Sequence, residues 1–253
     1  MVKAKLGYVL VLIKGLLSFL IFTVTSQFFS LLIFIPFTNK KKAASTFYTS
    51  LLNLYARFIL KTHFNIQIKY INKNKETFDN PVLVVCNHQS IIDVPISMSF
   101  TSKIRVLNNN WHDNKVARFF ITKYIGFFSI FEEKNKLVSD LEPSVSLGCP
   151  VLVFPEGIMS NNQKIHRFHK GGFYLAQKLR MNVQPVVIFY SKDILKKSWF
   201  YLKHGKAIVK FLEPVEIDSG IYGQTYQELT HYIMNEMRRE YADLKKTVES
   251  GGY

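Results

Sequence analysis

The sequence predicts an α/β fold in which a mixed, largely parallel sheet is flanked by helices. Short apolar runs that are typical of buried strands alternate along the chain with stretches of helical spacing. With 253 residues, 48% of them hydrophobic, the chain has enough material for one sizeable α/β domain and an apolar appendage. Two separate globular domains are therefore not expected.

The apolar appendage is at the N-terminus, where residues 15–38 carry no charged side chain. That run is long enough for a membrane segment of about 20 residues and too long for a signal-peptide core of about 7 to 15. Lysines flank the run on both sides, so the flanks do not identify one cytoplasmic side. Residues 47–60 have apolar positions at helical spacing and form the predicted second arm. We therefore expect residues 1–63 to be membrane-associated helices, arranged as a hairpin or lying in the interface; a single span and a soluble core helix are the alternatives.

Residues 64–253 are predicted to form the α/β domain. Its strands are expected at residues 65–70, 81–86, 104–107, 127–131, 151–154, 183–188 and 206–211. The last of these alternates polar and apolar residues, which we interpret as an edge strand. Its helices are expected at residues 94–101, 113–124, 134–147, from residue 170 onward, and at residues 224–246.

A formal net charge of +15 indicates an anionic partner, either a membrane surface, a nucleic acid or an acidic carrier. The basic residues are dispersed and no recognition motif is visible, which argues against nucleic acid. The two cysteines, Cys86 and Cys149, lack metal-ligand spacing. We expect both to be buried free thiols of a protein in the reducing cytoplasm.

A polar stretch follows the predicted strand at residues 81–86 and contains His88 and Asp93. An imidazole with a carboxylate five positions later suits general-base chemistry on a hydroxyl, because His88 takes the proton while Asp93 holds the other ring nitrogen. The competing interpretation is helix capping, with Asp93 or Ser90 at the N-cap of the next helix. Five residues turn an ideal helix about 140° off face, so His88 and Asp93 meet only if His88 lies in the loop before the helix.

A second polar loop follows the predicted strand at residues 151–154 and runs through Glu156 and Gly157. Glycine lets the backbone approach a ligand, and its N–H is a candidate donor to an oxyanion or a phosphate. The alternative is an ordinary Pro-Gly turn without a function of its own. Further along, His166 and His169 stand three residues apart without a third ligand at a usual spacing, so we expect no metal site.

In this order, four stretches resemble the motif set of the glycerolipid acyltransferases, typified by bacterial 1-acylglycerol-3-phosphate acyltransferases. They are Asn87-His88 through Asp93, Phe154-Pro155-Glu156-Gly157, Phe168-x-Lys170-Gly171 and Pro185-Val186-Val187. The resemblance implies that His88 is the general base and that Asp93 orients it. It also implies substrate contacts, which we assign to Asn87, Glu156, Gly157, Ser160, Lys170 and Gly171. The implied acyl donor is a thioester of acyl carrier protein or coenzyme A, with no cofactor.

Two departures from the family pattern concern the acceptor. The third motif of the family usually reads Phe-Pro-Glu-Gly-Thr-Arg-Ser, and its Arg contacts the acceptor's phosphate, whereas this chain has Ile158-Met159 in place of Thr-Arg. The second motif usually ends in an Arg, but here Glu132-Glu133 follow the aromatic strand. The catalytic pair is therefore intact while the anion-binding arginines are absent. Lys164, Arg167 or Lys170 is a candidate replacement for the missing charge.

The sequence therefore predicts a membrane-associated O-acyltransferase that moves a fatty acyl chain from a thioester to the hydroxyl of a lysophospholipid-like acceptor. We expect it on the inner (cytoplasmic) membrane, with the catalytic domain in the cytoplasm and its basic surface on anionic lipid. One alternative is an acceptor without a phosphate, such as a lyso-aminolipid. Another is a non-catalytic lipid-binding scaffold of the same fold. A serine hydrolase is disfavoured because no Gly-x-Ser-x-Gly elbow is present.

Overall fold

The computed structural model describes residues 41–61, 66–108, 126–160, 162–190 and 205–252, together with Ile13, Leu17, Leu20, Ile21 and Val24. The predicted helix at residues 113–124 lies outside the described residues, and so does most of the predicted first membrane arm at residues 15–38.

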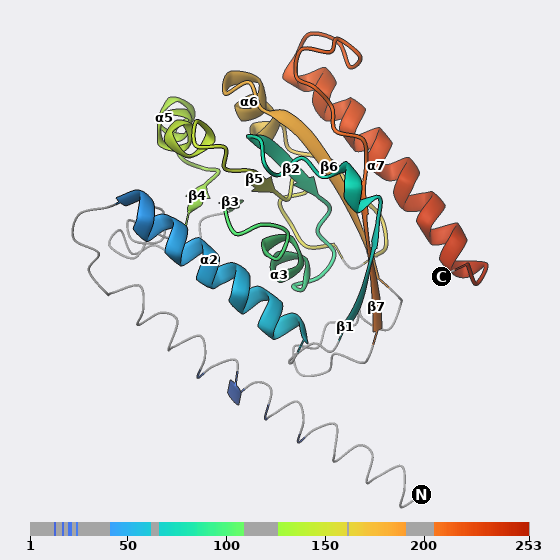
Figure 1. The fold of residues 1–253 in the computed structure, drawn as a ribbon. Coiled ribbons are helices and arrows are strands. Elements are labelled where there is room, and N and C mark those ends of the chain that lie inside the picture. The colour runs from blue at the N-terminus through green and yellow to red at the C-terminus, as the bar shows by residue number, and fades with distance from the viewer. Residues whose placement is uncertain are drawn as a thin grey trace, which may run out of the picture.

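Strands and helices alternate through the described chain (Figure 1). The strands are β1 (Ile66–Ile71), β2 (Val82–Cys86), β3 (Arg105–Asn108), β4 (Phe127–Ser129), β5 (Val151–Val153), β6 (Asn182–Tyr190) and β7 (Gly205–Phe211). The helices are α2 (Lys41–Ile59), α3 (Asp93–Met98), α5 (Lys134–Val145), α6 (Gly171–Lys178) and α7 (Tyr226–Glu249), with a 3-10 turn η2 (Lys73–Lys75). Each predicted element of the α/β domain within the described residues is found within a few residues of its predicted bounds, whereas α2 begins at Lys41, before the predicted start of the second arm at residue 47.

The strands form one seven-stranded sheet in the order β1-β7-β6-β2-β5-β3-β4. Neighbouring strands are parallel except for β6 and β7, which are antiparallel. This confirms the predicted mixed, largely parallel sheet. The prediction of an edge strand at residues 206–211 is wrong, because β7 lies between β1 and β6. The alternation of polar and apolar residues in β7 depends on what packs against the two faces of the strand and does not indicate its neighbours within the sheet. Lys210, for example, forms an ion pair with Glu240 of α7.

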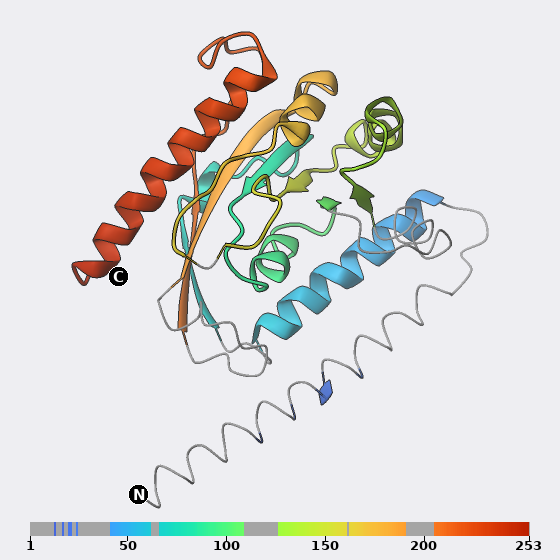
Figure 2. The same ribbon diagram turned by 180° about the vertical axis from the view of Figure 1, so that it is seen from behind.

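Helices cover both faces of the sheet (Figures 1 and 2). Successive residues of β2 point to opposite faces and enter two apolar cores. Leu83 and Val85 pack in the core covered by α5, α6 and α7. Val82, Val84 and Cys86 pack in the core covered by α2 and α3. A strand that is apolar on both sides is what a sheet between two helical layers requires. Cys86 and Cys149 are buried and free, as predicted.

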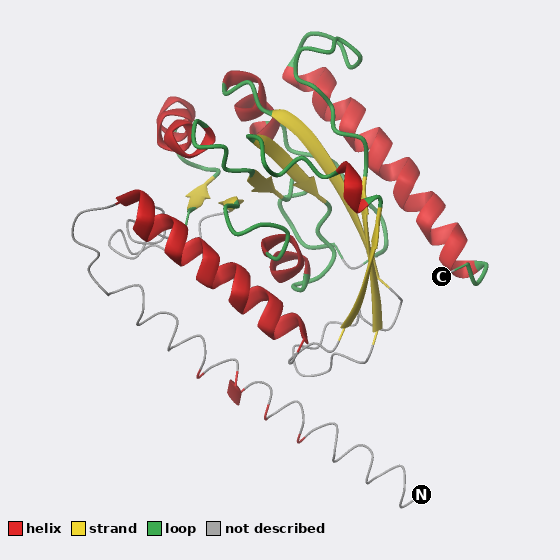
Figure 3. Ribbon diagram, viewed as in Figure 1, coloured by secondary structure: helices red, strands yellow, loops and turns green. Residues whose placement is uncertain are grey.

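The parallel strands in the middle of the sheet bring their carboxyl ends to one edge (Figure 3). The register aligns Val85 of β2 with Val153 of β5, and Val153 with Leu107 of β3. The loop after β2 and the loop after β5 therefore begin side by side. The two motif loops singled out in the sequence are brought together by this register.

Helix α2 lies over α3 and buries Ala56 and Ile59 in the core. Phe47, Leu54 and Phe58 on the same helix are exposed. Among the residues that the structure describes, no helix is both long and apolar enough to cross a membrane. The predicted boundary between residues 1–63 and 64–253 stays a prediction.

Candidate active site

His88 and Asp93 meet at the carboxyl end of β2. His88 lies in the loop that leaves the strand, and Asp93 is the first residue of α3, so the pair has the geometry that the helix argument required. Nδ1 of His88 lies 3.0 Å from Oδ2 of Asp93. The Asp93 side chain is fully buried, whereas that of His88 is 19% exposed. The carboxylate is thus enclosed while the ring keeps a face toward solvent.

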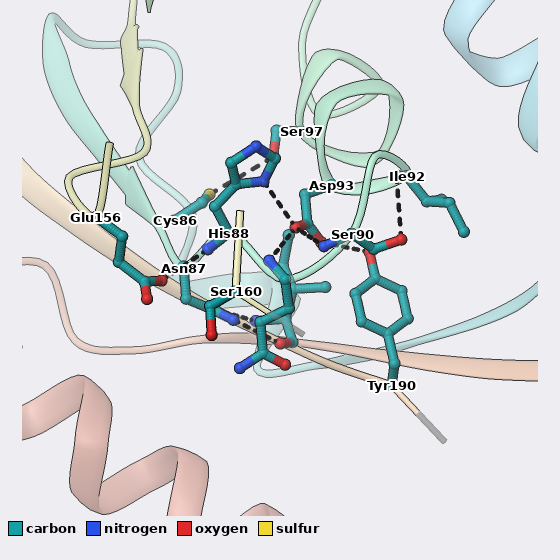
Figure 4. A network of polar contacts seen from close by, with 12 residues as sticks. Cys86, Asn87, His88, Ser90, Ile92, Asp93, Ser97, Glu156, Ser160 and Tyr190 are labelled. Atoms are coloured by element: carbon teal, nitrogen blue, oxygen red, sulfur yellow. Dashed lines mark hydrogen bonds and ion pairs between the residues drawn. The ribbon is translucent and has the colours of Figure 1, made fainter. Parts of the chain in front are cut away.

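The Asp93 carboxylate accepts hydrogen bonds from four donors (Figure 4). Oδ2 accepts from His88 and from the backbone N–H groups of Gln89 at 2.6 Å and Ser90 at 2.7 Å. Oδ1 accepts from the Tyr190 hydroxyl at 2.5 Å. Four donors around one carboxylate fit its ionised, acceptor-only form. No side chain caps α3, whose N-cap is Ile92, so the capping interpretation is wrong in its usual form: Asp93 gathers the N–H groups of the preceding loop.

A hydrogen bond at its edge and a stacking contact on one face fix the orientation of the His88 ring. The Phe154 ring stacks on it with centroids 4.5 Å apart and planes 28° from parallel. Because an ionised carboxylate only accepts, the proton of the neutral imidazole lies on Nδ1. Nε2 then carries the lone pair that a general base needs.

Glu156 lies beneath the pair and binds backbone, not solvent. Its Oε1 accepts the N–H of His88 at 2.9 Å, and its Oε2 accepts the N–H of His166 at 2.8 Å. Burial raises the pKa of this carboxyl, and the two N–H groups partly counteract that rise. Glu156 therefore joins two loops. Its predicted acceptor contact stays a prediction.

Gly157 and Ser160 shape the loop after β5. Gly157 has a φ of 70°, a conformation that favours glycine, and a Cβ there would lie 3.0 Å from Cδ2 of His169, so a larger residue would also require the His169 ring to shift slightly. Its N–H donates to the Phe154 carbonyl at 3.1 Å, so in this structure that group serves the turn and is not a free donor to an oxyanion. Ser160 donates its N–H to the His88 carbonyl at 2.8 Å and its hydroxyl to Asn162.

The remaining predicted contact residues lie at differing distances from the pair. Asn87 is fully buried, and its side-chain amide makes two hydrogen bonds with the backbone of Ile188, of 2.9 and 2.7 Å, which tie the loop to β6. Lys170 is exposed at the N-cap of α6, and Gly171 packs near Ile130. Among the predicted contact residues, only Gly157 lines the cavity described next. The substrate roles of the others stay predictions.

A cavity of about 580 Å³ opens beside His88. Its walls are mostly apolar side chains from both motif loops, two helices and two strands, including Leu52, Ile59, Met98, Val106, Phe127 and Met159. The volume falls within the range of about 300–1,000 Å³ that is usual for small-molecule pockets. An apolar chamber with an oriented imidazole in its wall suits an apolar substrate whose reacting group is polar.

Sequence reasoning missed two side chains of this site, Phe154 and Tyr190, and one side chain of α7, Tyr241, that contacts the loop after β2 from outside the site. Phe154 was noted only as part of a motif, Tyr190 ends an apolar strand and is indistinguishable there from a core aromatic, and Tyr241 lies in the charged closing helix. Tyr241 donates to the Gln89 side chain at 2.7 Å. The partners of these residues are about 60 to 150 positions away along the chain, so no local pattern identifies them.

Fold and site together define an acyltransferase domain. A family model described as Acyltransferase matches residues 67–189, a span that includes both motif loops and β6 up to Phe189. The resemblance drawn from the four motifs is confirmed.

Two curated relatives and one solved structure are similar to this chain. The human 1-acyl-sn-glycerol-3-phosphate acyltransferase beta is 28% identical over 180 residues, 68% of this chain and 64% of that protein. A lyso-ornithine lipid O-acyltransferase of Pseudomonas aeruginosa is 29% identical over 121 residues, 45% of each. The chain thus spans less than two thirds of either relative. The crystal structure of the 1-acyl-sn-glycerophosphate acyltransferase PlsC from Thermotoga maritima matches with a TM-score of 0.73 at 20% identity, over 95% of this chain and 97% of that one, which shows the shared fold.

Proposed function

We propose that this chain is an O-acyltransferase that moves a fatty acyl chain from a thioester to the hydroxyl of a lysolipid. The observation that carries the proposal is the His88–Asp93 pair in the wall of the apolar cavity. The acyltransferase family match and the relatives that act on acylglycerol phosphates support the same reaction.

His88 acts as the general base in the proposed reaction. Its Nε2 takes the proton of the acceptor hydroxyl while that oxygen attacks the thioester carbonyl carbon. Asp93 stabilises the imidazolium that forms, because its Oδ2 accepts the Nδ1 hydrogen bond. The tetrahedral intermediate collapses with cleavage of the C–S bond, and the thiolate takes back the proton from Nε2. No covalent enzyme intermediate and no cofactor are needed.

In this proposal, the cavity holds the fatty acyl chain that is transferred. Each CH₂ group of the acyl chain that moves from water into this apolar cavity contributes roughly 0.8 kcal/mol to the free energy of binding. The donor is a thioester of acyl carrier protein or coenzyme A, both of which are anionic, and the formal charge of +15 favours either.

The test is a thiol-release assay in detergent with wild type beside His88→Ala. The panel holds lysophosphatidic acid, a neutral lysolipid and lyso-aminolipids, each with acyl carrier protein and coenzyme A thioesters. We expect release that depends on the acceptor, and a loss of roughly 100-fold or more in the variant. Folded wild type that binds lipid but turns over no acceptor with either donor would establish the non-catalytic scaffold instead.

A second acceptor class is favoured by the rim of the cavity. Ile158 is 68% exposed and Met159 49% exposed, and neither offers the bidentate donors that an Arg gives a phosphate. A lyso-aminolipid, the kind of acceptor named for the relative from Pseudomonas aeruginosa, does not require that Arg. In the same panel, preference for a lyso-aminolipid over lysophosphatidic acid selects this acceptor.

Membrane attachment through the N-terminal helices is part of the proposal. Phe47, Leu54 and Phe58 are exposed on α2 at positions i, i+7 and i+11, which places them on one stripe of the helix. The five described residues before it are helical, apolar and exposed as well. An interfacial or hairpin anchor on the cytoplasmic leaflet uses such a face, and the basic surface adds attraction to anionic lipid. Flotation with anionic vesicles tests this, and protein that stays unbound would refute it.

A further inference from the structure

Tyr190 is the last residue of β6, and its hydroxyl reaches the catalytic carboxylate from the side opposite His88 (Figure 4). The side chain is fully buried, and Oη lies 2.5 Å from Oδ1 of Asp93. Tyr190 is not among the residues that line the cavity. The contact joins residues 97 positions apart in the sequence.

We propose that Tyr190 is a positioning residue that holds the Asp93 carboxylate in plane and weakens the stabilisation of the His88 imidazolium by that carboxylate. This inference rests on the proposed function for its catalytic meaning, while the coupling of Tyr190 to His88 is a physical property that holds or fails separately.

The two oxygens of the Asp93 carboxylate accept hydrogen bonds from different donors, and this difference leads to the inference. Oδ2 accepts from His88, Gln89 and Ser90, which leaves Oδ1 to Tyr190. Without the phenol, Oδ1 would be a buried acceptor that has lost its hydrogen-bond partner, which costs free energy. The carboxylate would also lose one restraint on its rotation about the Cβ–Cγ bond. A donor on Oδ1 also draws negative charge away from Oδ2. The imidazolium is then stabilised less, and His88 stays available as a base at lower pH.

Tyr190 acts as a neutral donor and not as a proton source. Burial, followed by the Asp93 charge and the hydrogen bond to it, raises the pKa of its phenol well above the ordinary value. Other ionisable groups face the pair from the surrounding elements: Cys86 of β2, Tyr241 of α7, Glu156 of the loop after β5, and Tyr55 of α2, which lines the cavity with His88. Burial raises the pKa of Cys86 to about 12, and that of Tyr241 is raised by burial too, so both stay neutral.

Tyr241→Phe is the matched control for Tyr190→Phe. Tyr241 is also a buried tyrosine that donates to the same loop, but its partner is the Gln89 side chain. Both substitutions remove one buried hydroxyl, and only Tyr190→Phe removes a donor from Asp93. The full-length proteins are purified in detergent with ¹⁵N-labelled histidine, and the His88 signals are assigned by comparison with His88→Gln.

For Tyr190→Phe we expect the midpoint of the imidazole titration and the acid limb of kcat/KM to move to higher pH together, by about half a unit to one unit. The plateau kcat should fall several-fold while KM changes less than twofold, because Tyr190 is outside the cavity. Tyr241→Phe should leave both midpoints in place. Equal midpoints for wild type and Tyr190→Phe would overturn the inference.

Two further measurements keep the result interpretable. If Tyr190→Phe does not fold, 3-fluorotyrosine placed at position 190 by suppression of a stop codon gives a stronger donor, and the midpoints should move to lower pH; no movement there refutes the inference. If no acceptor is acylated, the proposed function fails, but the magnetic resonance titration needs no substrate and still decides the coupling. The two failures are therefore distinguishable.

Discussion

Two loops leave neighbouring strands of the same sheet, and a buried carboxylate lies at the end of one and within the other. The loop after β2 leads to Asp93, and the loop after β5 carries Glu156; the two residues are 0% and 3% exposed. Asp93 binds an imidazole ring, a phenol and two backbone N–H groups. Glu156 binds the backbone N–H groups of His88 and His166. In the proposed reaction, Asp93 thus orients the side chain that reacts, and Glu156 holds together the backbone that carries it.

This difference teaches that burial and position at a strand end do not decide whether a carboxylate is catalytic. The deciding feature is whether its hydrogen-bond partner can change protonation state. The ring held by Asp93 can do so, and the amides held by Glu156 cannot. Substitutions at Asp93 should therefore affect the reaction most, whereas those at Glu156 should affect stability more than chemistry.

Asp93→Asn should have the largest effect. An amide that presents its oxygen to His88 must present its nitrogen to Tyr190, and the reverse orientation places NH₂ against His88, Gln89 and Ser90. We expect kcat to fall roughly 100-fold or more, because the ring loses both its orientation and the charge that stabilises the imidazolium. We also expect a loss of about 1–3 kcal/mol in the free energy of unfolding from buried groups left unpaired. Steady-state kinetics and urea unfolding measure the two effects, and near-normal kcat in a folded variant would contradict the assignment.

Glu156→Gln should have an intermediate effect that is seen mainly in stability. Even when protonated, the carboxyl keeps a lone pair on each oxygen for the two N–H groups, whereas the NH₂ group of glutamine accepts neither and turns a donor toward one of them; we therefore expect a deficit of about 1–3 kcal/mol at pH 4 in the free energy of unfolding. Because the pKa of Glu156 is raised in the folded state, that state binds more protons than the unfolded chain between the ordinary value of 4.5 and the raised one. The stabilising contribution of Glu156 is therefore fully present below pH 4.5 and is lost as pH rises through the raised value. The deficit of the variant should narrow over the same range.

Urea unfolding of both proteins at a series of pH values measures this difference, in which the other titrating groups cancel. kcat should fall less than tenfold, since Glu156 touches backbone only. A loss in kcat as large as that of Asp93→Asn, without a loss of stability, would erase the distinction between the two loops.

Only part of this difference between Asp93 and Glu156 could be predicted from the sequence. His88 and Asp93 stand five residues apart, and local geometry gave the condition under which they meet, namely that His88 lies in the loop before the helix. The role of Glu156 was not accessible, because its partners at residues 88 and 166 are fixed by the pairing of β2 with β5 and by the path of a long loop. Tyr190 was missed for the same reason. The prediction of β7 as an edge strand failed because alternation describes the faces of a strand and not its lateral neighbours.

The smallest expected effect concerns the rim of the second loop, where side chains point outward. Met159→Arg places a guanidinium on the wall of the cavity, where it can donate two hydrogen bonds to a phosphate. We expect kcat/KM for lysophosphatidic acid to rise roughly 5- to 10-fold relative to that for a lyso-aminolipid, the scale of one partly exposed ion pair of about 1 kcal/mol. Stability should change by less than about 0.5 kcal/mol, because Met159 is half exposed.

Ile158→Arg is the matched control for that variant, since Ile158 adjoins Met159, is more exposed and does not line the cavity. It adds the same charge to the same loop, so any effect of general attraction between a cationic surface and an anionic lipid appears equally in both variants. A change in acceptor ratio confined to Met159→Arg would locate the acceptor's head group at position 159. Equal changes in the two variants would instead assign acceptor preference to the basic surface as a whole, and the loop after β5 would then serve only to hold His88 in place.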